Sequence, residues 1–515
     1  MRSRPLRCAC LSVALLAAAS PEPSPAAAPP EVAAPEPAAG SLFLHPERFA
    51  LADGSLGAAE RGLYFAPVNR STPDSGVLAV ELYRFPAQSS VPPGRPPIFV
   101  LNGGPGFEGL APRLAERDFY EEEIAPRTAI ADVVVVGQRG IGSSTPDTIC
   151  EPAAFPFVLG KNCREFWEGT GLDLAGFTVL EAAADVRDVA LALGYHQVVL
   201  TGGSFGSHWA MAVMRKHPEI VARAVLSGME GPDHTYDSPG GVLAALERIA
   251  AAAESSERLA GRIPEGGLLA GFRATLDRLR QGPVSVEIEH PESGETEEMQ
   301  FFLPQVQGLI MGYSGRISSR SGIASWPADL IALAEGDFER LARVRLRREA
   351  DGEEGGGGPR RYRTASYFML DCGSGISQQR RERLESDPAI EIVGDLGSFY
   401  DQACRAWPAD LGEEFRRNFE TDIPTVIVHG TWDTSTPYEN ALELAPHFLR
   451  GKLVTVEGGS HGALGEALRH SEDLRPALER FLAAGDLAGM PERVVLPEVD
   501  WEEPPAARSS AAADP

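Results

Sequence analysis

The chain has 515 residues, of which 43% are hydrophobic and 23% charged, and its net charge at pH 7 is −26. This length is too great for one simple core and fits a large domain that carries an inserted second one. The composition excludes a largely disordered protein, and so acidic a chain argues against nucleic acid or an anionic membrane as a partner.

The first 20 residues are typical of an export signal. Three arginines at positions 2, 4 and 7 precede the apolar run 8–19, which is too short to span a membrane. Small residues at 17–20 offer a cleavage site, and Cys10 precedes most of the apolar run, which disfavours lipid attachment. We therefore expect a secreted or periplasmic protein with no membrane span.

Composition divides the rest of the chain. Residues 21–40 are almost all Pro, Ala and Glu, which predicts a linker, and residues 487–515 predict a disordered tail. Between them we expect a core in two parts, 41–230 and 424–486. The intervening region, 231–423, predicts a mainly helical lid inserted over the carboxyl ends of the strands, where open α/β sheets bind ligands.

Short apolar runs in the core predict strands that are buried on both faces of a sheet. The helix that follows Thr178 begins with a possible capping box, Thr178 with Glu181, and closes at Gly194. Strands that alternate with such helices predict a doubly wound, mostly parallel α/β sheet. The expected strands are 77–85, 98–101, 133–136, 198–200, 225–226, 426–428 and 453–456.

A G-x-S-x-G motif, residues 202–206, lies between the predicted strand 198–200 and a helical run that Pro218 stops. In that context the serine occupies a sharp turn that exposes its hydroxyl at the sheet edge, beside a helix N-terminus. We predict that Ser204 is a nucleophile; an ordinary glycine-rich strand–helix turn is the alternative.

A serine nucleophile needs a base and an acid that orients it. His461 lies in a glycine-rich loop after the last predicted strand, whereas His208 and His217 lie on the helix after the serine. His234, at the start of the predicted lid, is a more distant alternative. Asp433 lies in the loop after the strand 426–428, where a helix-capping role is its alternative. The order Ser204, Asp433, His461 is that of the α/β-hydrolases.

The charge on a tetrahedral oxyanion needs hydrogen-bond donors. The amide of Phe205, which follows the nucleophile, is one candidate. The early loop 102–106 supplies the second through Gly103 or Gly104, and the sequence leaves the choice between them open.

Several motifs in order resemble the prolyl iminopeptidases and the related secreted bacterial tripeptidyl aminopeptidases. Residues 102–106 look like their H-G-G-P-G loop in its N-G-G-P-G form, and residues 138–144 are similar to their D-Q-R-G-x-G-x-S segment. Residues 202–206, 430–437, 459–462 and the late 404–408 also match. The resemblance covers roughly residues 60–485 and implies an aminopeptidase that works through an acyl-enzyme and needs no metal or organic cofactor. Gly137 replaces the family's usual Asp, and Phe107-Glu108 replace its small residues.

An aminopeptidase must bind an ammonium group, which needs a negative partner when it is buried. Glu108 follows the early glycine loop and Glu230 follows a predicted strand end, so we expect at least one of them to bind it. Asp233 and Asp237 are weaker candidates. For each of these carboxylates a solvated loop position is the alternative.

Four cysteines remain after the export signal, an even number in an oxidising compartment. We expect Cys150 to pair with Cys163 and Cys372 with Cys404.

The resulting hypothesis is an exported serine aminopeptidase whose substrate is a peptide with a free N-terminus. An esterase or other small-molecule serine hydrolase is the alternative within enzymes, and a non-catalytic binding protein on the same fold is the alternative outside them. The oligomeric state is left open.

Overall fold

The computed structural model describes residues 37–50, 56–106, 119–151, 153, 155–290, 294–310, 316–350, 364–407 and 409–504. Four expected features lie outside this set: the signal at 1–20, residues 21–36 of the linker, Glu108 and residues 505–515 of the tail. Backbone contacts separate Met1–Pro37 from a second unit, Ala38–Pro515, and every element described below belongs to the second. Within the described ranges, no helix combines the length and the apolar character that a membrane crossing requires.

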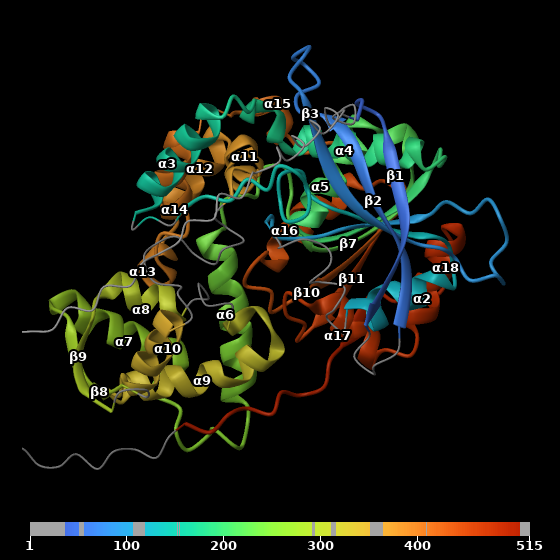
Figure 1. The fold of residues 1–515 in the computed structure, drawn as a ribbon. Helices are drawn as coiled ribbons and strands as arrows, with labels where there is room; N and C mark the ends of the chain where they lie inside the picture. Colours follow the sequence, from blue (N-terminus) through green and yellow to red (C-terminus); the bar gives the residue numbers. More distant parts are fainter. Residues whose placement is uncertain are drawn as a thin grey trace, which may run out of the picture. The chain divides into compact units, whose positions relative to one another are not determined.

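The centre of the fold is a ten-stranded sheet with the strand order β1-β2-β3-β5-β4-β6-β7-β10-β11-β12 (Figure 1). Strands from β5 to β12 in this order run parallel, while β1, β2 and β3 are antiparallel to their neighbours. All seven expected strands are present, and β1, β2 and β12 are additional. The bounds are β1 (Leu42–Ala50), β2 (Leu56–Pro67), β3 (Val77–Phe85), β4 (Ile98–Leu101), β5 (Val133–Val136), β6 (Val198–Ser204), β7 (Val221–Met229), β10 (Thr425–Gly430), β11 (Gly451–Glu457) and β12 (Arg493–Val495).

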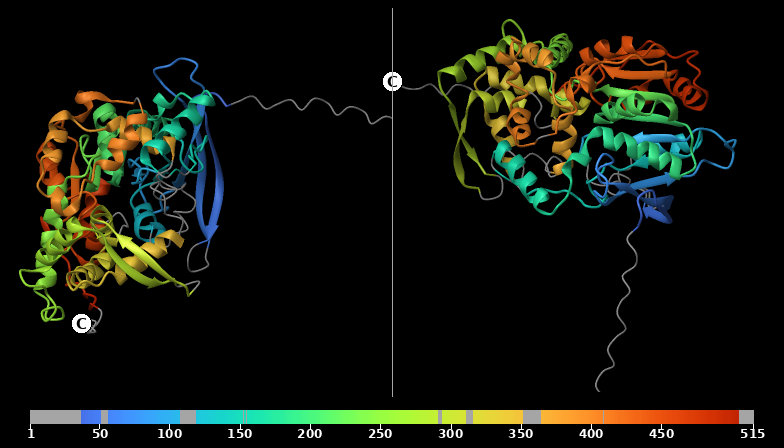
Figure 2. Two further views of the ribbon diagram at one scale, coloured as in Figure 1. Left: turned by 90° about the vertical axis from the view of Figure 1, so that its left-hand side faces the viewer. Right: turned by 90° about the horizontal axis from the view of Figure 1, so that it is seen from above.

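Helices cover both faces of the sheet, as a doubly wound fold requires (Figure 2). In β4, Phe99 belongs to the apolar cluster shared with one set of helices, and Ile98 belongs to the cluster shared with the other. Neighbouring residues of β4 therefore supply separate apolar clusters on opposite faces of the sheet. The first set is α4 (Val179–Ala192), α5 (Phe205–Lys216) and α16 (Tyr438–Leu444), and the second is α17 (Ala463–His470) and α18 (Leu474–Ala484).

The inserted region is mainly helical, as expected, but it also contains an antiparallel hairpin, β8 (Val284–Glu289) with β9 (Thr296–Phe301). One part of it has its own apolar core, in which Phe272 and Trp326 are buried. The other part, with Phe368, shares the core of the sheet and of α3 (Pro156–Gly169). The helices are α6 (Pro239–Glu254), α7 (Leu268–Gln281), α8 (Leu303–Ile310), α9 (Arg320–Ala334), α10 (Glu339–Ala350), α11 (Ala365–Ser374), α12 (Gln378–Glu385), α13 (Ile390–Val393), α14 (Ser398–Ala403) and α15 (Gly412–Arg416).

Short helical turns connect these elements. They are η1 (Phe119–Ile124), α2 (Ala125–Thr128), η2 (Leu174–Phe177), η3 (Pro218–Ile220), η4 (Arg316–Ser318), η6 (Cys404–Ala406) and η7 (Ala445–His447).

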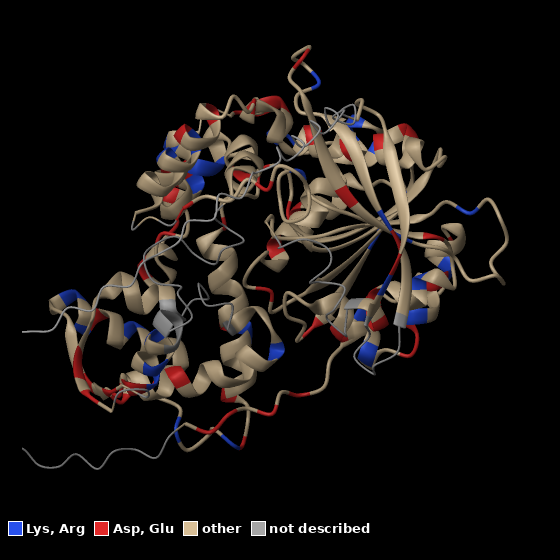
Figure 3. Cartoon of the chain, in the orientation of Figure 1, with Lys and Arg blue, Asp and Glu red and all other residues tan. Residues whose placement is uncertain are grey.

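The C-terminal segment differs from the sequence-based expectation of a disordered tail at 487–515. Residues 487–504 are ordered rather than a disordered tail, because β12 pairs with β11 and Trp501 is buried in the core of the inserted region. The Glu502 amide donates to the Ala324 carbonyl of α9 at 3.0 Å. Acidic residues of this segment, drawn red in Figure 3, form ion pairs with Arg258 and Arg340. We call residues 493–504 the C-terminal strap, since they join the sheet to the inserted helices.

The expected capping box on α4 is also wrong. Thr178 is the N-cap residue, but its side chain makes no capping hydrogen bond. Glu181 instead accepts hydrogen bonds from the Arg70 amide at 3.2 Å and from its guanidinium at 2.6 Å. An ion pair with a distant loop has therefore replaced the local contact.

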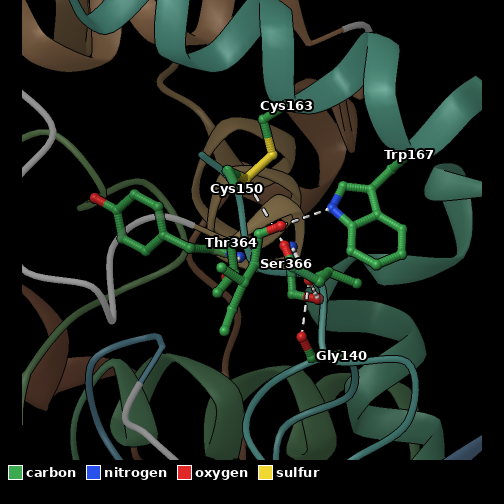
Figure 4. The surroundings of a disulfide bond; sticks show 9 residues. Gly140, Cys150, Cys163, Trp167, Thr364 and Ser366 are labelled. Atoms are coloured by element: carbon green, nitrogen blue, oxygen red, sulfur yellow. Dashed lines mark hydrogen bonds between the residues drawn. A yellow bond between two sulfur atoms is a disulfide. The ribbon is translucent and has the colours of Figure 1, made fainter. Parts of the chain in front are cut away.

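Both expected disulfides, Cys150–Cys163 and Cys372–Cys404, are present. Figure 4 shows the first of them beside the start of α11, where the Trp167 ring nitrogen donates to the Ile149 carbonyl at 3.2 Å. Ser366 of α11 meets the Thr148 hydroxyl at 2.9 Å, and that hydroxyl donates to the Gly140 carbonyl at 2.8 Å. The loop after β5 is thus joined covalently to α3 and by hydrogen bonds to α11.

Candidate active site

Ser204 is the last residue of β6 and the N-cap of α5, and its backbone has φ 56° and ψ −134°. A positive φ at a residue with a side chain is a strained conformation that persists only where the surroundings enforce it. A Cβ at Gly202 would lie 2.3 Å from the Gly206 carbonyl oxygen, and one at Gly206 would lie 2.1 Å from that of Leu101. Glycine is therefore required on both sides of the turn that presents Ser204.

His461 and Asp433 form a close pair. His461 Nδ1 lies 2.9 Å from Asp433 Oδ2 and 3.0 Å from Oδ1. The Asp433 carboxylate is fully buried and accepts hydrogen bonds from the amides of Ser435 and Thr436, each at 2.9 Å, and from the Thr436 hydroxyl at 2.8 Å. An ionised carboxylate fixed in this way holds the proton on Nδ1 and leaves Nε2 of His461 as the basic nitrogen.

The electrostatics of the pair favour the charged carboxylate. Burial lowers the pKa of His461, but the charge of Asp433 and the hydrogen bond to it outweigh burial and raise this pKa above its ordinary value. Burial acts to raise the pKa of Asp433, and the opposing charge and hydrogen bond of His461 bring it below its ordinary value. Asp433 is thus held as an anion, and His461 is a stronger base than a free imidazole.

The end of β7 lies between the two halves of this site. Ser204 pairs with Met229 of β7, and a Cβ built on Gly228 would lie 3.0 Å from Cε1 of the His461 ring and 3.2 Å from the Thr436 hydroxyl. The structure thus places Ser204 and the pair of Asp433 with His461 on either side of the end of β7, at the carboxyl edge of the sheet. The sequence alone does not indicate this contact of Gly228, because glycines are common near strand ends and only the fold places the histidine beside this one.

Other histidines beside the site have partners of their own, and His234 Nε2 lies 3.3 Å from Glu443 Oε1. His208 Nδ1 lies 2.9 Å from the Gly231 carbonyl and its Nε2 lies 2.9 Å from the Ser374 hydroxyl; burial lowers its pKa to about 4. His429 Nδ1 accepts from the Met229 amide at 3.1 Å, and burial lowers its pKa as well. Both rings are thus held neutral by their surroundings, so neither competes with His461.

The early glycine loop lies against the first turn of α5. The ideal Cβ position of Gly206 is 3.3 Å from the carbonyl carbon of Asn102. Within the described residues, the amides of Gly103 and Gly104 have no hydrogen-bond acceptor. The early glycine loop therefore lies beside the turn that contains Phe205, at the junction of β4, β6 and α5.

Of the two expected ammonium-binding residues, Glu108 lies outside the described residues. The Glu230 amide donates to the Ser207 hydroxyl at 2.9 Å, and that hydroxyl donates to the Ser204 carbonyl at 2.7 Å. Burial, followed by the charges of Asp371 and Asp237, raises the pKa of Glu230 well above its ordinary value. The Glu230 backbone is therefore connected to the serine turn through Ser207, and its carboxylate is repelled by two other carboxylates.

Asp237 and Asp371 are the two carboxylates that act on Glu230, and we call the three residues the acidic cluster. Burial raises the pKa of Asp237 and of Asp371 to about 7. The Tyr400 hydroxyl donates to Asp371 Oδ2 at 3.1 Å. Asp371 lies in the otherwise uncharged helix α11, and that isolated charge is the signal by which the sequence shows it. Asp233, the remaining weaker candidate, instead accepts from the Ser377 amide and hydroxyl, both at 2.6 Å.

Comparison with known families agrees with this geometry. Residues 96–254, which include the early glycine loop and Ser204, match the family described as alpha/beta hydrolase fold. Residues 392–491, which include Asp433 and His461, match the family described as TAP-like protein. The chain has the α/β-hydrolase fold.

Relatives of this α/β-hydrolase include peptidases. Serine protease Hip1 of Mycobacterium tuberculosis is 24% identical over 438 residues, which cover 79% of this chain and 82% of that protein. Proline iminopeptidase of Neisseria meningitidis is 30% identical over 156 residues, which cover 30% of this chain and 40% of that protein. A solved esterase from Thermogutta terrifontis has a TM-score of 0.34 and 14% identity, covering 82% of this chain and 99% of that one. The serine protease and the proline iminopeptidase support a serine hydrolase or peptidase of this fold.

Proposed function

We propose that this α/β-hydrolase is an exported serine aminopeptidase that releases N-terminal residues or short peptides. The observation that carries the proposal is the acidic cluster, Glu230, Asp237 and Asp371, connected to the serine turn. Carboxylates whose charges are desolvated and repelled by other carboxylates are stabilised by a cation. The protonated α-amine of a peptide is such a cation, and it would be bound within reach of the first peptide bonds.

The proposed reaction is acyl transfer. Ser204 Oγ attacks the carbonyl carbon of the scissile bond while His461 Nε2 accepts the hydroxyl proton. The amides of Phe205 and of Gly103 or Gly104 donate to the resulting oxyanion. His461 then gives the proton to the leaving amine, the C–N bond breaks, and the N-terminal fragment stays on Ser204 as an ester. Water, deprotonated by His461, hydrolyses that ester and regenerates the serine.

Export is supported by two features of the chain. The first 20 residues have the composition of a cleavable signal, and two disulfides join cysteines of the described residues. Structural disulfides form and persist in oxidising compartments. Mass spectrometry of the protein recovered outside the cytoplasm should therefore find a mature N-terminus near residue 20 and both disulfides intact.

The aminopeptidase assignment is tested with chromogenic peptides of one to four residues, each with a free and with a blocked N-terminus. The parent should hydrolyse only the free forms efficiently, and Ser204→Ala should lower turnover by several orders of magnitude without unfolding the protein. A parent that prefers blocked peptides or simple esters would instead be an endopeptidase or an esterase. A Ser204→Ala variant with near-normal turnover would remove Ser204 from the mechanism.

The acidic cluster is tested by neutralising it. Glu230→Gln and Asp371→Asn should each raise KM for free peptides and leave hydrolysis of a blocked ester nearly unchanged. Asp329→Asn is a matched control, because Asp329 is also a buried carboxylate of the inserted region but pairs with Arg340 at 2.7 Å. If Glu230→Gln and Asp371→Asn change KM no more for free peptides than for the blocked ester, as expected of Asp329→Asn, the ammonium group binds elsewhere.

A further inference from the structure

Gln138 lies at the junction between two neighbouring strand ends. It follows β5, and the early glycine loop, residues 102–106, follows β4, which pairs with β5 in parallel. Gln138 is buried, with 6% of the residue's surface exposed. Its amide nitrogen donates to the carbonyls of Asn102, at 3.1 Å, and Gly103, at 3.0 Å, and its amide oxygen accepts from the Gly106 amide at 2.9 Å. One side chain thus contacts the backbone of the loop at three points.

The orientation of this amide follows from its partners. The Gly106 amide can only donate, so the atom facing it must be the oxygen of Gln138. The two carbonyls can only accept, so the atom facing them must be the nitrogen. A flipped amide would lose all three hydrogen bonds, and a buried glutamine cannot replace them with water.

These contacts determine where the loop amides point. In a planar trans peptide the C=O and the following N–H point in opposite directions. A hydrogen bond that holds the Asn102 carbonyl on Gln138 therefore turns the Gly103 N–H away from Gln138. The bond to the Gly103 carbonyl does the same for the Gly104 N–H. These are the two candidate oxyanion donors that the sequence could not separate, and a single side chain orients both.

The residues on either side hold Gln138 in place. The Gly137 amide donates to the Glu81 carbonyl at 2.8 Å, and a Cβ at Gly137 would lie 2.7 Å from that oxygen, which explains the absence of the aspartate usual in similar sequences. The Arg139 guanidinium is fully buried and donates twice to Asp185, each time at 2.7 Å, and to the Val68 carbonyl at 2.8 Å. Gln138 therefore projects from a backbone with little freedom to move.

We propose that Gln138 is a positioning residue for the oxyanion site: it aims the amides of Gly103 and Gly104 without touching the substrate. This inference rests on the proposed acyl-transfer function. It requires that loss of the Gln138 contacts weaken transition-state binding more than substrate binding, because the oxyanion exists only after attack by the serine.

The test replaces Gln138 by methionine, which has a similar length and no hydrogen-bonding amide. With a small ester and with a free peptide, kcat should fall by about 10- to 100-fold, less than the loss of a donor itself, and KM should change by less than about threefold. The inhibition constant of a peptidyl trifluoromethyl ketone, which forms a tetrahedral oxyanion on the serine, should rise by the same factor as kcat/KM falls. Inhibition by the free product peptide should not change.

The matched control is Gln307→Met. Gln307 is also a buried glutamine, and its amide nitrogen donates to the carbonyls of Glu391 and Ile392 at 3.2 and 3.3 Å within the inserted region. It should lose stability without a change in the affinity for the trifluoromethyl ketone. Should Gln138→Met fail to fold, Gln138→Glu keeps the shape and the acceptor for Gly106 but, when ionised, loses both donors, and should give the same kinetic pattern.

The outcomes separate this inference from the proposed function. A parent enzyme inactive on every ester and peptide would refute the proposed function itself. An active parent, together with Gln138 variants that keep the parent's kcat and inhibitor affinity, would overturn only the positioning role. Equal losses of kcat in the Gln138 and Gln307 variants would also overturn it, because a general loss of rigidity would then explain both.

Discussion

Replacing Gly228 by alanine should move the proposed base, although Gly228 itself lies in β7 and not in the loops that hold Asp433 and His461. The added Cβ would lie 3.0 Å from His461 Cε1 and 3.3 Å from Nδ1, so the ring must shift by a few tenths of an ångström. A misplacement of 1 Å can cost about 100-fold in rate, so a shift of this size should lower kcat by about 4- to 10-fold. The left-handed backbone at this position, φ +47°, should also cost about 1–2 kcal/mol of stability.

Steady-state kinetics on a small ester, together with thermal unfolding, would measure both effects. Gly194→Ala is the matched control, because Gly194 also has a positive φ, +84°, but a Cβ there meets no atom within 4 Å. It should lose similar stability and keep its kcat. If Gly228→Ala also keeps the parent's kcat, the ring of His461 is not held against β7, and the arrangement described for the pair with Asp433 is wrong.

Three further predictions concern charge and the C-terminal strap. Since Asp433 raises the pKa of His461, a pH–rate profile should show kcat/KM rising with pH through a pKa above about 6.5. The same profile of Asp433→Asn should show a lower pKa, and kcat should fall by about 10⁴-fold. Asp237 and Asp371, with pKa values of about 7, lose their charge as the pH falls through 7, so KM for free peptides should rise there while that of a blocked ester stays flat. Trp501→Ala should cost about 3–5 kcal/mol, and a thermal midpoint equal to the parent's would show that the strap does not stabilise the inserted region.

The strands beside the site were predictable because they are short, apolar and buried on both faces, as in Val133–Val136. The antiparallel β1 and β2 were missed because much of β1 is exposed and lacks that pattern. β12 was missed for a different reason: it has three residues in an acidic, proline-containing segment, and only its pairing with β11 makes it a strand. The strands β1, β2 and β12 form because of contacts with distant parts of the chain, which local sequence preferences do not indicate.

Some residues of the candidate site were likewise predictable from the sequence, whereas others reach the site only through the fold. Ser204, Asp433 and His461 each lie at a strand end within a recognisable motif, so the sequence indicates all three. Asp371 lies in the middle of a helix far along the chain, and only the packing of α11 brings it to Glu230. The three contacts of Gln138 likewise depend on the adjacency of β4 and β5, which a sequence pattern does not specify.

The pairing of β7 with β10 joins two parts of the chain that are far apart, and the Met229 amide reaches His429 across 200 residues. During synthesis, the ribosome completes the serine turn long before it reaches Asp433 and His461. A chain that stops anywhere within the inserted region therefore carries the proposed nucleophile without its base or its acid. Under the proposed assignment such a fragment is chemically inert, and hydrolysis begins only once the second part of the core has been made and has joined the sheet.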